Sequence, residues 1–163
     1  MFPRHPEYLS LIVWLGLACR PPGRAGDARS QPSRDSAAVA ETTVAFLQAF
    51  DSLDWTGFVA HLSDSVDAYW PRGDTPERLR DRAAVEGRFR AFFDQVRASR
   101  PGPPYLHLAV SDLSIRILGD VGLVTFELSD VPDTLGRRTL VFRRDPTGWR
   151  IVHLHASNLP PGN

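Results

Sequence analysis

Spaced hydrophobic positions predict helices in the first half of the folded chain. In residues 36–53, side chains suited to burial recur at alternating steps of three and four, which places them on one helical face. These positions are Val39, Thr43, Phe46, Phe50 and Leu53. Ser36 is the expected N-cap, and the helix is expected to run to about Ser52.

Two shorter helices are expected to follow. Asp54 can accept free backbone amides of a first turn, which predicts a helix from Asp54 to about Leu62. A further helix is expected from about Asp81 to Ala98. Its buried face is expected to carry Val85, Phe89, Phe92 and Val96.

Strands are expected at one short segment and over most of the second half. The stretch VDAYW (residues 66–70) ends at Pro71, and PRGDTPE is expected to be a loop. Four longer strands are expected at residues 105–118, 121–129, 137–144 and 149–157. Because GD at 119–120 and DPTG at 145–148 are short, turn-like connections, the strands are expected to pair antiparallel. The order of elements predicts an α+β fold with helices on one face of a curved sheet.

Charge and motifs exclude several classes of function. All 19 basic residues are arginine, and the formal net charge is zero. Residues 1–36 carry five arginines and three acids, so the remaining chain has a charge of about −2 with no basic block. Nucleic-acid binding needs a concentrated cationic face and is therefore not expected. No P-loop, nucleophile elbow, cysteine pair or HExxH stretch appears, and no cofactor is predicted.

The N-terminus has the layout of an export signal. Arg4 and His5 precede LSLIVWLGLA (residues 9–18), an apolar run too short for the roughly 20 residues that span a bilayer. Cys19 is the one cysteine, and the segment resembles a bacterial lipoprotein signal, although Gly16 stands where leucine is usual. This resemblance implies a signal peptide at residues 1–18 and a lipidated Cys19. Residues 19–35 would be a flexible tether and residues 36–160 the folded domain.

The lipoprotein resemblance also implies a location. Aspartate follows the cysteine in inner-membrane lipoproteins, whereas Arg20 follows it here. We therefore expect a bacterial envelope protein held at the outer membrane or in the periplasm by its N-terminal lipid, or a secreted protein otherwise.

Two stretches carry a resemblance to a protein family. FDSLDWTGFVAHLSDSVDAYWP in the first half and RRTLVFRRDPTGWRIVHLHAS in the second resemble SnoaL-like domains of the nuclear transport factor 2-like superfamily. The last strand also resembles the association domain of the calcium/calmodulin-dependent protein kinase II family, which oligomerises. The resemblance covers residues 37–160 and implies a cone-like fold with a pocket between helices and concave sheet. Fold alone does not decide what such a pocket holds.

The histidines of the last strand are candidate functional residues. Strict alternation would place Trp149, Ile151, His153 and His155 on one face and Val152, Leu154 and Ala156 on the other. A metal site needs a third ligand, for which only His107 or Asp67 is available, so metal binding is not favoured. Either imidazole could transfer a proton if an acidic partner lay beside it. Pocket or dimer-interface histidines are the favoured interpretation.

The remaining candidates are aromatic or charged. Tyr69 and Trp70 lie on opposite faces of their strand, so one should face the pocket, whereas Trp55 and Phe58 are expected in the core. Glu127 shares a face with Leu123 and Thr125. It is expected either to form a cross-strand ion pair with Arg138 or Arg116, or to be an inward acid with a raised pKa.

These observations favour one function and leave two open. The favoured one is a dimeric, lipid-anchored or secreted module that holds a small, partly apolar ligand. Its predicted pocket comprises Tyr69, Trp70, Arg138, His153 and His155. The second is a small-pocket lyase, isomerase or hydrolase that uses His153 or His155 with Glu127 or Asp67. The third is an oligomerisation or envelope-assembly domain.

Overall fold

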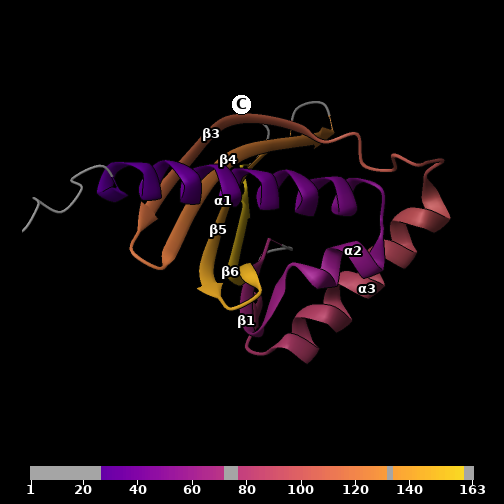
Figure 1. The fold of residues 1–163 in the computed structure, drawn as a ribbon. Helices are drawn as coiled ribbons and strands as arrows, with labels where there is room; N and C mark the ends of the chain where they lie inside the picture. Colours follow the sequence, from indigo (N-terminus) through magenta and orange to yellow (C-terminus); the bar gives the residue numbers. More distant parts are fainter. Residues whose placement is uncertain (1–26, 72–76, 132–133, 160–163) are drawn as a thin grey trace, which may run out of the picture.

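The computed structural model describes residues 27–71, 77–131 and 134–159, which form three helices and a six-stranded curved sheet (Figure 1). This α+β arrangement confirms the predicted fold class. The predicted signal peptide and Cys19 lie outside the described residues. The helices are α1 (Asp27–Asp51), α2 (Trp55–Ala60) and α3 (Arg82–Ser99). The strands are β1 (Leu62–Trp70), β2 (Glu77–Leu79), β3 (Ala109–Leu118), β4 (Val121–Val131), β5 (Thr134–Asp145) and β6 (Gly148–Asn158).

Helix α1 begins earlier than its hydrophobic spacing predicts. The expected start was Ser36, but the helix begins at Asp27, so the part of the predicted tether from Asp27 onwards is helical. Asp35 gives a physical reason, because it is 7% exposed and forms an ion pair with Arg144 of β5. That contact ties the helical turn before Ser36 to the sheet, which a search for apolar periodicity does not detect.

The two other helices begin at aspartate caps. The Oδ1 atom of Asp54 accepts a hydrogen bond from the Gly57 amide at 3.1 Å, as expected for α2. The Oδ1 atom of Asp81 accepts one from the Ala84 amide at 2.8 Å at the start of α3. In α3 the buried phenylalanines are Phe89 and Phe93; the predicted Phe92 is half-buried.

The sheet has the strand order β2-β1-β6-β5-β4-β3. β3, β4, β5 and β6 are joined as antiparallel neighbours, whereas β1 pairs parallel with β6. β2 overlaps the predicted loop at residues 71–77 and forms an edge strand against β1. It was missed because three residues are too few to show an alternating pattern, although Leu79 is buried.

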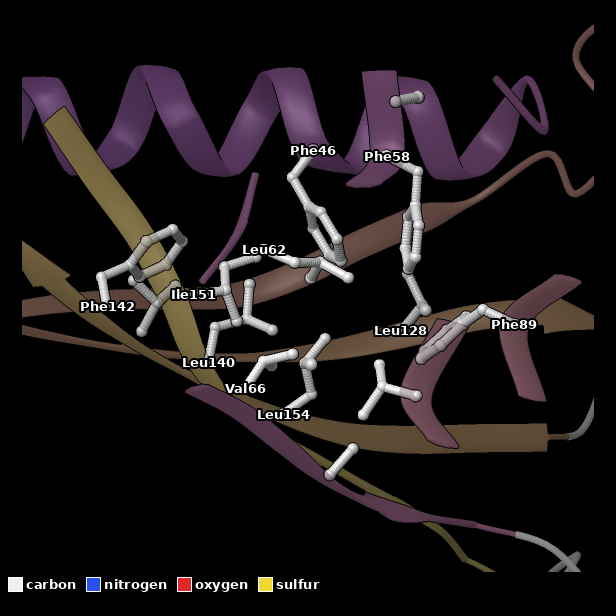
Figure 2. Packing of buried hydrophobic residues seen from close by; sticks show 14 of the residues in the cluster. Phe46, Phe58, Leu62, Val66, Phe89, Leu128, Leu140, Phe142, Ile151 and Leu154 are labelled. Carbon is white, nitrogen blue, oxygen red and sulfur yellow. The ribbon is translucent and has the colours of Figure 1, made fainter. Parts of the chain in front are cut away.

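The hydrophobic core fills the space between the helices and one face of the sheet, called the inner face here (Figure 2). Phe46 of α1 and Phe58 of α2 belong to the same buried cluster as the strand residues Leu128 and Leu140, and Phe58 is fully buried. α1 approaches the sheet closely at Gly122, where a Cβ would lie 3.0 Å from Val39. The opposite side of the sheet is called the outer face.

Candidate functional site

A cavity of about 360 Å³ lies on the inner face, between the sheet and helices α1 and α3. Its size falls in the range of roughly 300–1,000 Å³ that is usual for small-molecule sites. The lining comes from both helices, from strands β1, β4, β5 and β6, and from the segment before β3. The lining residues are Phe46, Leu47, Phe50, Ala68, Tyr69, Trp70, Pro71, Phe89, Phe92, Gln95, Leu106, Leu108, Phe126, Leu128, Arg138, Leu140, Leu154, His155, Ala156 and Asn158.

Aromatic rings form the helical wall of the cavity. Phe50 stacks on Phe92 with a centroid distance of 5.8 Å and meets Phe89 edge-on at 5.9 Å. Trp70, at the end of β1, meets Phe89 at 5.0 Å and Phe92 at 5.7 Å. Because these rings contact one another at edge-to-face and stacked distances, the wall is preformed.

Few polar side chains line the cavity, and the described ones include no carboxylate. Arg138 of β5 lies over Gly136, where a Cβ would be 2.5 Å from the guanidinium. It donates hydrogen bonds to the Ser157 carbonyl at 2.9 Å and to Asn158 Oδ1 at 3.1 Å. Gln95 and His155 complete the set of polar lining residues with Arg138, Asn158 and Tyr69.

The outer face carries a second polar cluster. His153 Nδ1 lies 2.5 Å from Asp67 Oδ1, and Arg78 Nη2 donates to Asp67 Oδ2 at 3.0 Å. The Tyr69 ring lies 6.0 Å from the His153 ring and 5.6 Å from the His155 ring. Burial alone would raise the pKa of the Asp67 carboxyl, but the hydrogen bonds and charges of His153 and Arg78 outweigh it, so its pKa lies below the ordinary 3.8.

A β-bulge separates His153 from the cavity and corrects the predicted faces of β6. Ile151 pairs with Phe142, but the next pair is His153 with Val141, so Val152 is an extra residue. Alternation therefore shifts by one: Ile151 is on the inner face, whereas His153 is on the outer face. The inner-face positions after the bulge are Leu154, Ala156 and Asn158.

The other candidate residues from the sequence, Glu127 and His107, do not line the cavity. Glu127 is on the outer face, and its cross-strand partner is Arg137, with Nε 4.0 Å from Oε1, rather than Arg138 or Arg116. His107 precedes β3 and is exposed. Within the described parts of the chain, no group of three or more His, Cys, Asp or Glu residues could hold a metal ion.

Trp70 and Arg138 thus line the cavity from the inner face. Tyr69 and His155 border it as well, but their rings meet each other on the outer face, where His153 joins Asp67. The sequence reasoning assigned Phe89 and Phe92 to helix burial and did not single out Asn158. The helical spacing does mark these phenylalanines, but it cannot separate a ring packed in the core from one at a cavity wall. Asn158 shares a face with Ala156, which becomes the cavity face only after the bulge.

Comparison with known proteins places the chain in context. The profile of the SnoaL-like domain matches residues 39–161. No curated protein sequence matches the chain. An NTF2-like family protein from Streptomyces avermitilis, named as a candidate dehydratase, superposes with a TM-score of 0.66 at 22% identity, over 78% of this chain and 98% of that one.

Two further structures are similar in fold. A candidate ketosteroid isomerase from Parabacteroides distasonis superposes with a TM-score of 0.58 at 20% identity, over 76% of this chain and 86% of that one. The S. rosetta CaMKII hub superposes with a TM-score of 0.60 at 24% identity, over 76% of this chain and 96% of that one. At these identities the likeness concerns the fold.

Proposed function

Since the chain belongs to the SnoaL-like domain family, we propose that its domain binds a small, largely apolar molecule in the inner-face cavity. The observation that carries this proposal is the cavity of about 360 Å³ with its wall of contacting aromatic rings. Protein interiors are normally close-packed, and unfilled apolar volume costs stability. A ligand that fills the cavity would recover those lost contacts.

The charge distribution favours binding over acid/base catalysis in the cavity. A small-pocket enzyme of the kind considered above would need a histidine and a carboxylate together at the cavity wall. His155 borders the cavity, but its ring meets Tyr69 on the outer face, and no carboxylate is among the described lining residues. The Asp67–His153 pair is on the outer face, so its chemistry would require a substrate on that side of the sheet.

Dimer formation and export belong to the same proposal. The outer face carries half-buried Leu123 and Val141, which a second copy of the chain would cover. The LSLIVWLGLAC stretch supports export and attachment through Cys19 to the bacterial cell envelope. An assembly domain, the third candidate function, would form the dimer without needing a ligand.

Filling the cavity tests the binding proposal. The neutral fluorophore N-phenyl-1-naphthylamine should bind the full chain with a rise in fluorescence that saturates at one site per chain. Ala156→Phe, which adds a ring inside the cavity, should weaken this binding by about tenfold or more, as lost apolar contacts of about 1.4 kcal/mol would. Ser157→Phe places the same ring on the outer face and should bind like the wild type.

Two results would count against the proposal. One is no saturable binding by the wild-type chain, and the other is equal loss in the two phenylalanine variants with both still folded by circular dichroism.

A further inference from the structure

A polar hollow of about 520 Å³ lies at the end of the sheet where β6 begins, and its lining shares no residue with the inner-face cavity. It is bounded by the end of α2, the start of β1, the end of β5 and the turn that leads into β6. Three arginines and three hydroxyl side chains are among its described lining residues. These are Arg82, Arg143, Arg150, Ser63, Ser65 and Thr147. The hollow therefore suits a charged ligand, unlike the aromatic cavity on the other side of the sheet.

The hollow lies where β1 bulges away from β6. Leu62 pairs with Ile151, but the next pair along the two strands is Asp67 with His153. Residues 63–66 of β1 therefore stand opposite a single residue of β6. Bulges of this kind are over-represented beside functional sites, where they open a sheet or redirect its side chains.

Arg82 supports the displaced segment of β1. Its Nη1 donates to the Leu62 carbonyl and to Asp64 Oδ1, each at 3.0 Å, and its Nε donates to Glu86 Oε1 at 2.6 Å. The charge of Arg82 is thus matched by two carboxylates. The two remaining arginines, Arg143 and Arg150, are the groups suited to a ligand.

Arg143 of β5 and Arg150 of β6 stand directly opposite each other on the outer face. Cβ atoms at such positions are about 4.5–5.5 Å apart, and like charges there destabilise a sheet. Asp145 Oδ2 lies 3.8 Å from Arg150 Nε, while its Oδ1 accepts hydrogen bonds from the Thr147 amide and hydroxyl at 2.7 Å. Among the described residues, no carboxylate forms an ion pair with Arg143. An anion between the two guanidinium groups would remove their repulsion.

The two arginines are held differently. Arg150 Nη1 donates to the Ala60 carbonyl and Nη2 to Thr147 Oγ1 at 3.1 Å, so this guanidinium is fixed from two sides. Arg143 Nη2 donates to Ser65 Oγ at 3.4 Å, a long contact that uses one of the five N–H donors of a guanidinium. Arg143 is exposed, so a ligand can reach it from solvent, and its binding should weaken as salt concentration rises.

We propose that this hollow binds the phosphate group of a small phosphate monoester between Arg143 and Arg150, with the Ser65 hydroxyl as a further donor. Guanidinium groups bind phosphate oxygens through paired, charge-assisted hydrogen bonds. Donors on two strands and on the bulge approach from several directions, which suits a tetrahedral phosphate better than a planar carboxylate. The site is separate from the apolar cavity, so this inference does not depend on the proposed function.

Three polar probes test the class of ligand without entering an apolar cavity. Glycerol 3-phosphate, glycerate and glycerol are titrated into the full chain by calorimetry in phosphate-free buffer at about pH 7.5, where the monoester carries about two negative charges. Glycerol 3-phosphate should saturate at one site per chain and bind at least about tenfold more tightly than glycerate. Glycerol should show no binding.

Arg143→Gln should weaken the binding of glycerol 3-phosphate by about tenfold or more, because it removes a charge-assisted contact. Arg116→Gln is the matched control, since it removes the same charge from an exposed position opposite Leu123 on the outer face. It should bind like the wild type. Ser65→Ala should weaken binding several-fold, as the loss of one hydrogen bond would.

Urea unfolding without phosphate separates binding from folding. Arg143→Gln removes one of two opposed charges, so it should be at least as stable as the wild type. Glycerol 3-phosphate should stabilise the wild type and leave Arg143→Gln almost unchanged.

Four results would overturn the inference. They are no saturable binding of glycerol 3-phosphate by the wild type, equal binding of glycerate, unchanged binding by Arg143→Gln, and an equal loss in Arg116→Gln. Each leaves the test with the naphthylamine unaffected, because that probe reports on the inner-face cavity.

Discussion

The environment of the Asp67 side chain is set by residues that lie far from it in the sequence. Asp67 lies next to inner-face Ala68 in sequence, but its side chain is on the outer face between His153 and Arg78. The sequence analysis offered Asp67 or Glu127 as the acidic partner of His153 or His155, on the condition that the carboxylate lay beside the histidine. The parallel pairing of β1 with β6 meets this condition, and nothing in the local pattern of either strand predicts that register.

The pair makes stability depend on pH in a defined window. Because the pKa of Asp67 in the folded protein is below its ordinary 3.8, the ionised carboxylate stabilises the fold at all pH values well above 3.8. That contribution should be lost as pH falls from 3.8 through the lower folded pKa. Asp67→Asn should therefore lower the free energy of unfolding by about 1 kcal/mol at pH 7, allowing for partial exposure, and by less at pH 3.

Urea unfolding of the wild type and variant at equal concentration and several pH values measures this difference. Asp94→Asn is the control, since the Asp94 side chain is 71% exposed and reaches Arg97 only at 3.7 Å. It should change stability little at any pH. A difference for Asp67→Asn that stays constant from pH 7 to pH 3 would show that the ionised pair does not provide the stabilisation.

At the scale of elements, strand β6 has features that the sequence predicts and one feature, a bulge, that it does not. Its existence and approximate ends follow from alternation and from the DPTG turn, and the caps of α2 and α3 follow from Asp54 and Asp81. The bulge at Val152 does not follow, because it is set by the unequal pairing of β6 with its two neighbours. One extra residue moves His153 from the predicted pocket face to the outer face.

The half-buried apolar residues on the outer face of the sheet predict that two chains associate through this face. Val141 of β5 is half-buried there, paired with Leu123 of β4 on one side and His153 of β6 on the other. We expect light scattering to give twice the mass of a single chain for the wild type. Val141→Arg should give the single-chain mass, because a cationic group in the centre of a buried interface lacks a partner.

Val44→Arg makes the same change on α1, where Val44 is 48% exposed, and should leave the dimer intact. A monomeric wild type would contradict the dimer. A Val141→Arg variant that remains dimeric would place the interface on another surface.

At the scale of the whole molecule, the fold is easier to predict from the sequence than the cavity is. Helical spacing followed by long alternating strands was sufficient for the α+β class, because that class depends on patterns that run over many residues. The family resemblance came from two long stretches, residues 50–71 and 137–157. The cavity exists because some aromatic side chains of the helices leave space between themselves and the sheet. Phe92 is half-buried at the cavity wall, whereas its neighbour Phe93 is buried in the core. No periodicity encodes that difference.

Attachment of the whole protein to a membrane is the property that depends least on the folded domain. No helix in the described residues is long and apolar enough to cross a membrane. The predicted anchor is a lipid on Cys19, at the end of the LSLIVWLGLA run. When the full chain is expressed in a bacterium and the cells are fractionated, we expect it in the membrane pellet.

Cys19→Ser removes the acceptor for the lipid and should move most of the protein to the soluble fraction. Gly16→Leu restores the residue that is usual three positions before the cysteine, so it should keep or increase the membrane-bound share. Mass spectrometry of the N-terminal peptide should find the acyl chains in the wild type and in Gly16→Leu. An unchanged pellet fraction for Cys19→Ser would refute the lipid anchor, because one or two acyl chains are the expected source of membrane affinity.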